Sequence, residues 1–286
     1  MRRPLLSQSW SAALAAVAGS GLVGVMPLAA LHLYADGLSP ASMLFWRYVI
    51  AILALAAAAV LAGIGFSQAW RNGAWRVVLL GATLGAGQTL CFWESIKTLE
   101  TSIAVLLFYT YPAVTVALDR LVFKQHVRPL SLLCIGAILS GAALITAPGL
   151  HHGTLDPRGL AWALPAPLLY AAYLAINVRI LRRHKPLIGA AGLYLGMAVT
   201  FGAMAAWLGL NVPTTPAGWA WLLFIGIGPG AVTMTLFTYS VPRLGASSFA
   251  ILANTELVVV VSIGVLVLGE AMTPWRAVGG ALIVGG

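Results

Sequence analysis

Ten apolar stretches divide this 286-residue chain, and they constrain its fold more than any other feature. A bilayer core roughly 30 Å thick requires about 20 apolar residues per helix, which is the typical length of these stretches. Only 8% of the residues are charged, too few to cover a water-exposed surface. We therefore predict an all-α integral membrane protein with ten transmembrane helices. The predicted helices are 10–33, 41–63, 76–97, 101–121, 129–147, 158–180, 187–208, 217–240, 246–268 and 274–286.

The lysines and arginines alternate in density from one predicted loop to the next. If the N-terminus is inside, the loops on its side carry twelve of them and the opposite loops carry three. Positively charged loops stay in the cytoplasm, so both termini are predicted to be cytoplasmic. The twelve are Arg2, Arg3, Arg71, Arg76, Arg120, Lys124, Arg128, Arg179, Arg182, Arg183, Lys185 and Arg243; the three are Lys97, Arg158 and Arg276.

Several other classes of protein fit the sequence poorly. The net charge of +9 is spread between apolar spans, whereas a nucleic-acid partner would require one basic patch. Arg2 and Arg3 before an apolar run would also suit a signal peptide, but no polar domain follows the run. Cys91 and Cys134 lie inside apolar spans without CxxC or Cys/His spacing, so we predict no disulfide, metal site or cofactor.

The two halves of the chain resemble each other. A constant shift of 145 residues carries Gly81, Gly85, Phe92 and Ser95 onto Gly226, Gly230, Phe237 and Ser240. Each half holds five predicted helices, an odd number, so the second copy enters the membrane from the opposite face. We predict two inverted five-helix repeats, 1–147 and 148–286, around one site at the middle of the membrane. Chance alignment of glycine-rich helices is the alternative.

Polar side chains at depth in a membrane span are costly, and those that persist usually face a cavity or a partner helix. Asn254, Thr255 and Glu256 lie about ten residues into the helix predicted over 246–268. Thr255 also belongs to a stripe at every seventh residue with Ser248 and Ser262, which we expect to face inward. These residues are the candidate polar contacts of the second half.

Aromatic residues at similar depth accompany them in the other helices. The helix over 101–121 carries Tyr109, Tyr111 and Pro112, and a proline there can kink the helix and expose backbone to a cavity. Tyr170, Tyr173 and Asn177 share one face of the helix over 158–180, and Trp93 and Glu94 belong to the helix over 76–97. An aromatic lining with a few polar groups suits an amphipathic substrate whose amino group binds a carboxylate. Interfacial belts or helix packing would explain the same aromatic residues without a substrate.

Arg47 and the glycine pairs have two interpretations each. Arg47 could form a structural ion pair with Glu94, or act as a gate or as a contact for a substrate carboxylate. Gly81 with Gly85 and Gly226 with Gly230 allow helices to approach closely. Pro229 could also loosen its helix into a hinge, although packing alone would account for this cluster.

The chain resembles the drug/metabolite transporter superfamily, in its ten-helix EamA type, over nearly its whole length. The resemblance rests on the paired halves, on Arg47, on the run from Tyr109 to Pro112 and on Gly269-Glu270 followed by 279–283. Trp93-Glu94 and the pair Tyr170 and Tyr173 are similar to bacterial aromatic amino-acid exporters of the YddG type. Glu256 and Leu257 stand where the superfamily often has a proline. The resemblance implies an inner-membrane exporter of amino acids and related amphiphiles.

We therefore predict a secondary transporter that exports amino acids by alternating access, as a monomer or weak oligomer in the lipid bilayer. A proton-coupled efflux pump for broader substrates is the alternative, because a desolvated Glu94 or Glu256 binds its proton more tightly. An intramembrane enzyme is disfavoured, since all five histidines fall in loops or at span ends and no HExxH occurs. No catalytic residue is predicted.

Overall fold

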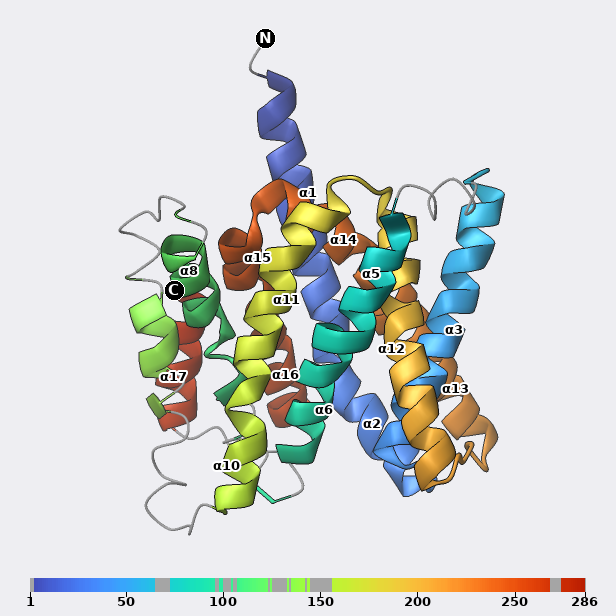
Figure 1. The fold of residues 1–286 in the computed structure, drawn as a ribbon. Helices are drawn as coiled ribbons and strands as arrows, with labels where there is room; N and C mark the ends of the chain where they lie inside the picture. The colour runs from blue at the N-terminus through green and yellow to red at the C-terminus, as the bar shows by residue number, and fades with distance from the viewer. Residues whose placement is uncertain are drawn as a thin grey trace. The chain divides into compact units, whose positions relative to one another are not determined.

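A computed structural model describes residues 3–64, 73–95, 98–99, 104, 107–122, 124, 133, 135–141, 143–144, 156–267 and 274–285. Six helical spans are long and apolar enough to cross a membrane: Trp10–Ala35, Pro40–Leu61, Trp75–Ser95, Pro157–Leu181, Pro186–Leu208 and Pro216–Leu244. Each corresponds to one predicted helix, and no strand occurs in the described residues. The all-α membrane fold is confirmed (Figure 1).

The structure describes the remaining four predicted helices in part. The stretch 101–121 contributes α8 (Tyr111–Leu121), which begins after a turn at 109–110. The stretch 246–268 is not one helix but two, α15 (Ala246–Ala253) and α16 (Thr255–Leu266), separated by a turn at Asn254. The last predicted helix is α17 (Pro274–Gly285). Most of 129–147, with Cys134, and the Gly269-Glu270 pair lie outside the described residues, so the count of ten stays a prediction.

The chain forms two compact units, each made from both halves of the sequence. Unit 1 comprises Met1–Ala86 and Ile176–Leu244, and unit 2 comprises Gly87–Ala175 and Gly245–Gly286. The boundaries fall within two helices, α6 (Ala86–Ser95) and α11 (Pro165–Leu181). Helix α10 (Pro157–Ala163) precedes α11 in unit 2.

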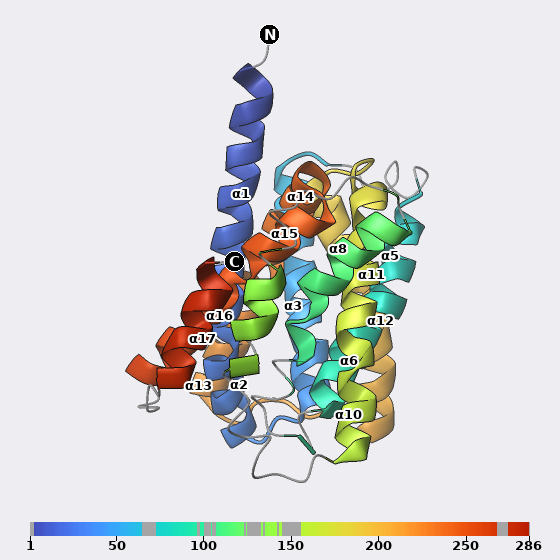
Figure 2. The same ribbon diagram turned by 90° about the vertical axis from the view of Figure 1, so that its left-hand side faces the viewer.

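In unit 1, α3 (Pro40–Leu61) lies along α12 (Pro186–Leu208). Helix α1 (Arg3–Gly24), which continues as α2 (Met26–Ala35), packs against α14 (Thr233–Leu244) (Figure 2). Prolines start α3, α12 and α13 (Pro216–Ile225), where a missing backbone N–H costs no helical hydrogen bond. Ser39 and Thr215 cap α3 and α13 by accepting bonds from the backbone N–H groups of Ser42 and Gly218.

Two π-helical turns interrupt the long helices of unit 1 at positions related by the 145-residue shift. The first, η2 (Gly81–Gly85), follows α5 (Trp75–Leu80), and the second, η3 (Gly226–Val232), lies between α13 and α14. Helix α12 packs on η2, and α3 packs on η3. A π-turn widens the helix, and such turns are frequent at functional sites.

An acidic side chain ties two loops of unit 1 together outside the spans. Asp36, which follows α2, accepts hydrogen bonds from the Thr214 hydroxyl at 2.6 Å and from the backbone N–H groups of Thr214 and Thr215. The bond from the Thr214 hydroxyl is the main cause that lowers the pKa of Asp36 below its usual value. This anchor fixes the entry into α13, and therefore into η3.

Candidate substrate-binding site

Two helix interruptions in unit 2 occupy positions related by the same shift of 145 residues. The first is the turn at Tyr109 and Thr110, and the second is the turn at Asn254. In both, a threonine hydroxyl donates to a carbonyl three residues earlier: Thr110 to Leu107 at 2.7 Å and Thr255 to Leu252 at 2.9 Å. The sequence therefore places a matching local break in each half. Interrupted helices in transporters expose backbone and side-chain groups where a substrate can bind.

Helices α8 and α15 bring the two breaks together. The helices pack side by side, as both views show (Figures 1 and 2). The Tyr111 hydroxyl donates to the carbonyl oxygen of Ala250 at 3.3 Å. Pro112 lies in the first turn of α8, where it starts a helix instead of bending a continuous one. At the predicted kink the helix is therefore interrupted completely. Tyr111, the first residue of α8, is 2% exposed.

Aromatic rings from three segments form one cluster in unit 2. Phe108 is its centre, with ring centroids 5.2 Å from Phe92, 5.5 Å from Tyr111 and 5.3 Å from Tyr170. Tyr111 meets the Tyr170 ring edge-on at 4.7 Å, and Tyr170 stacks on Tyr173 at 5.9 Å. Such pairs stabilise by about 0.5–1.5 kcal/mol beyond the area they bury. The predicted tyrosines Tyr109, Tyr111, Tyr170 and Tyr173 are therefore brought together.

Glu256 provides the acidic group beside this cluster. It lies in the first turn of α16 and is half-buried, and its carboxylate interacts with the hydroxyls of Tyr109 and Tyr111. A carboxylate in the first turn is favoured by the positive end of the helix dipole. Thr255 directs its hydroxyl to Leu252, so that donor is already used within the helix break. Ser248 and Ser262 are exposed, so the stripe expected to face inward is not buried.

Trp93 connects to the cluster through its neighbour, Phe92. The Trp93 and Phe92 rings meet edge to face at 5.8 Å, and Phe92 contacts Phe108. Both Trp93 and Glu94 are half-buried on α6. Phe92 and Phe108 were missed as site residues, because an apolar ring in an apolar span looks the same whether it packs in a core or lines a site. Their place next to Trp93 and Tyr109 was the only signal.

Two further predicted residues belong to unit 1. Asn177 follows Tyr173 on α11 but lies past the unit boundary, and it is 2% exposed. Arg47 is buried in α3, donates to the carbonyl oxygen of Pro229 at 3.2 Å and lies 5.4 Å from the Tyr48 ring centroid. Asp36 is the only acidic residue in the sequence of unit 1, and Thr214 and Thr215 hold it. The ion pair predicted between Arg47 and Glu94 stays a prediction.

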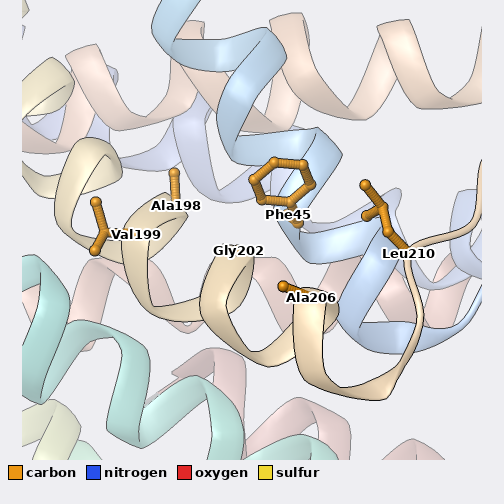
Figure 3. Close-up of a pocket in the computed structure, with 6 residues that line it drawn as sticks. All are labelled: Phe45, Ala198, Val199, Gly202, Ala206 and Leu210. Carbon is orange, nitrogen blue, oxygen red and sulfur yellow. The ribbon is translucent and has the colours of Figure 1, made fainter.

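A shallow groove of about 510 Å³ in unit 1 has a different character (Figure 3). Phe45 of α3 and Gly202 and Ala206 of α12 line it together with Ala198, Val199 and Leu210. None of these side chains carries a polar group that could hold an ammonium or a carboxylate. The groove does not suit a charged substrate, and it contains no predicted site residue. Within the described residues, no cluster of histidine, cysteine and acidic side chains could hold a metal ion.

Comparison with known proteins gives the biological class. The EamA-like transporter family matches residues 10–147 and again residues 157–286. The chain belongs to the EamA-like transporter family. It is therefore a multi-pass membrane transporter and not an enzyme, and the EamA resemblance is confirmed.

Two named relatives and one solved structure are similar to this chain. The threonine/homoserine exporter RhtA of Salmonella typhimurium is 29% identical over 203 residues, which cover 69% of this transporter and 64% of RhtA. A probable terminal-alkyne amino-acid exporter of Streptantibioticus cattleyicolor is 27% identical over 264 residues, covering 90% and 86% of the two chains. A protein of known crystal structure shares the fold with a TM-score of 0.79 at 20% identity, over 96% of this chain and 94% of that one.

Proposed function

We propose that this transporter exports amino acids with aromatic or other hydrophobic side chains. The observation that carries the proposal is the aromatic cluster around Phe108 with the Glu256 carboxylate beside it. Aromatic rings contact an apolar side chain, and a carboxylate binds an ammonium group. One cluster thus offers contacts to both ends of an amphipathic amino acid.

The relatives support the substrate class but not its side chain. RhtA is named as an exporter of threonine and homoserine, and the Streptantibioticus relative is named as a probable exporter of an alkyne amino acid. Both names specify amino acids, and neither specifies an aromatic one. In this chain the rings of Phe108, Tyr111 and Tyr170 are mostly apolar, so they favour a substrate with a larger apolar side chain.

The proposed mechanism is alternating access between two inverted repeats, 1–147 and 148–286, in a bacterial inner membrane with both termini in the cytoplasm. Support comes from the two family matches and from the paired features at a shift of 145 residues, namely η2 with η3 and the breaks at Tyr109 and Asn254. Cysteine labelling at Lys124 and Lys185 tests the orientation. Access of a membrane-impermeant reagent to either position from the periplasm would refute it.

Transport in reconstituted liposomes tests the substrate. Labelled phenylalanine, tryptophan, threonine and lysine are followed in parallel, with protein-free liposomes as the baseline. We expect flux of phenylalanine and tryptophan well above that of lysine. Preference for threonine would reassign the transporter to small hydroxylated amino acids, and flux of none of the four would reject amino-acid export.

Variants at the cluster connect transport to the residues. Tyr111→Ala and Glu256→Gln should each reduce phenylalanine flux by about ten-fold or more, since each removes a contact of at least about 1.4 kcal/mol. The matched controls are Tyr239→Ala and Asp156→Asn. The Tyr239 hydroxyl forms a hydrogen bond with the exposed Ser11, and the Asp156 side chain caps α10. Flux that falls equally in controls and site variants would remove the assignment of the cluster.

Proton coupling is the second candidate, favoured by the half-buried Glu256 within the predicted span 246–268. An imposed pH gradient should then drive uphill substrate flux, and Glu256→Gln or Glu94→Gln should abolish the dependence. Flux that does not respond to the gradient in the wild-type protein would reject this mechanism while leaving amino-acid export intact.

A further inference from the structure

The strongest unexplained feature near the cluster is the side chain of Asn254. It is 3% exposed, and neither its amide nitrogen nor its amide oxygen has a hydrogen-bond partner in the described part of the chain. Buried polar groups are nearly always paired, and an unpaired one costs about 1–3 kcal/mol. The unpaired amide of Asn254 therefore needs an explanation.

Local structure does not supply that cause. Asn254 occupies the position just before α16, where asparagine is one of the best capping residues. Its backbone angles are helical instead of extended, and its side chain caps no N–H group. Thr255, the next residue, stabilises the break by its own bond to Leu252. Asn254 thus carries a donor and an acceptor that no described residue uses.

The position of Asn254 places this amide beside the proposed substrate contacts. It follows Ala250 by four residues and so lies on the same face of α15, and the Ala250 carbonyl accepts the bond from Tyr111. Glu256 lies two residues further on, beside Tyr109. Tyr109 is the residue that the 145-residue shift pairs with Asn254. Tyr109 and Glu256, one from each break, therefore meet next to the aromatic rings.

We propose that Asn254 recognises the carboxylate of an α-amino acid while Glu256 binds its ammonium group, so that the site selects zwitterions. This deepens the proposed function and rests on it. The amide nitrogen of Asn254 donates to the substrate carboxylate, and its oxygen remains available to accept from the ammonium. A substrate that carries both groups pairs both polar atoms of the amide, whereas a substrate with one group leaves one of them unpaired.

Competition with two truncated analogues tests this division of roles. Phenethylamine lacks the carboxylate of phenylalanine, and 3-phenylpropanoate lacks the amino group. Each is titrated against labelled phenylalanine in liposomes containing the wild-type protein. We expect both analogues to bind about ten-fold or more weakly than phenylalanine, since each forfeits at least one charged hydrogen bond.

The variants should separate the two ends of the substrate. Asn254→Leu, which keeps the side-chain size, should lower the affinity for phenylalanine towards that for phenethylamine. It should change the affinity for phenethylamine little. Glu256→Gln should weaken phenethylamine and leave 3-phenylpropanoate nearly unchanged. Asn254→Asp, which replaces the donor by a second carboxylate, should weaken the binding of phenylalanine further and strengthen the binding of phenethylamine. Asn254→Asp keeps the test decisive if Asn254→Leu is not recovered as folded protein.

The outcomes distinguish this inference from the proposed function. If the wild-type protein transports phenylalanine and Asn254→Leu keeps the wild-type ratio of phenylalanine to phenethylamine affinity, the role of Asn254 is overturned and amino-acid export stands. If the wild-type protein binds phenethylamine as well as phenylalanine, zwitterion selection is overturned. If it moves no amino acid, both proposals fall.

Discussion

The π-turns η2 and η3 of unit 1 share a backbone irregularity but are closed in different ways. At η2, a Cβ atom on Gly81 would overlap the carbonyl oxygen of Leu193, so α12 lies directly on the turn, backbone to backbone. Thr200 donates to the Ala82 carbonyl at 2.9 Å. At η3, Arg47 donates to the Pro229 carbonyl and Tyr194 to the Gly230 carbonyl at 3.4 Å.

The difference shows how an internal repeat can diverge while its backbone is kept. A π-turn leaves carbonyl groups without a helical partner, and buried carbonyls must find another donor. A neutral hydroxyl meets this need at η2, whereas a buried guanidinium meets it at η3 together with the Tyr194 hydroxyl. The second solution places a positive charge inside a membrane span, which is expensive and usually functional.

The largest effect is expected at the η2 contact. Gly81→Val should destabilise unit 1 by more than about 4 kcal/mol, because the new side chain meets backbone that cannot move aside. The matched control is Gly21→Val, since a Cβ on Gly21 meets no atom within 4 Å. Expression and size-exclusion chromatography in detergent measure the outcome. A monodisperse, thermally stable Gly81→Val protein would show that the two helices are not in backbone contact.

The next effect concerns the charged contact at η3. Arg47→Ala should lower the free energy of unfolding by about 1–3 kcal/mol, because it leaves the Pro229 carbonyl without a donor. Arg243→Ala, which removes an exposed arginine bonded to the Tyr239 carbonyl at 2.6 Å, should change it little. Thermal unfolding in detergent compares the two. An unchanged Tm for Arg47→Ala would mean that the desolvation of the guanidinium cancels its hydrogen bond.

A smaller loss is expected from the neutral donor at the same turn. Tyr194→Phe should cost about 0.5–1 kcal/mol, since the ring stays packed against Tyr48 at 4.9 Å and only one long hydrogen bond is lost. Tyr239→Phe removes a hydroxyl bonded to an exposed serine and is the control. If Tyr194→Phe lowered the free energy of unfolding as much as Arg47→Ala, the charge of Arg47 would add no stability beyond that of a neutral donor.

The smallest effect belongs to the loop anchor at the start of α13, which has no counterpart before α5 in the described residues. The lowered pKa of Asp36 means that its stabilising contribution is present above the usual value near 4 and is lost as pH falls through the lowered value. Thr214→Val should therefore reduce Tm slightly at pH 7, and the reduction should shrink as the pH falls through the lowered pKa of Asp36. A reduction that stays the same across this pH series would indicate lost packing instead of a lost charge-assisted bond.

Much of this fold could be predicted from the sequence because lipid leaves few choices. Long apolar runs predicted six membrane-spanning helices within a few residues, and the glycine pairs predicted close approach at Gly81 and Gly226. The breaks at Tyr109 and Asn254 were not foreseen as breaks. Neither glycine nor proline marks Asn254, and helix propensity differs too little between asparagine and its neighbours to end a helix there.

The candidate site was predictable only in its polar part. Tyr109, Tyr111, Tyr170 and Tyr173 were found because hydroxyls are unusual at depth, and they do meet in unit 2. Phe108, which contacts most of them, carries no such mark. Asn177 shares a helix face with Tyr173 but belongs to unit 1, because helical spacing says nothing about where one packing unit ends.

The bare backbone contact between Gly81 and Leu193 also affects how genetic data on this transporter should be interpreted. In a saturation-mutagenesis screen, position 81 will reject even alanine, and so will Gly196, whose Cβ would overlap the Val78 carbonyl. Scored by growth alone, the two positions would look like substrate contacts. Counting surface-expressed protein alongside growth separates them, since cells carrying these variants lose the transporter itself and not its selectivity.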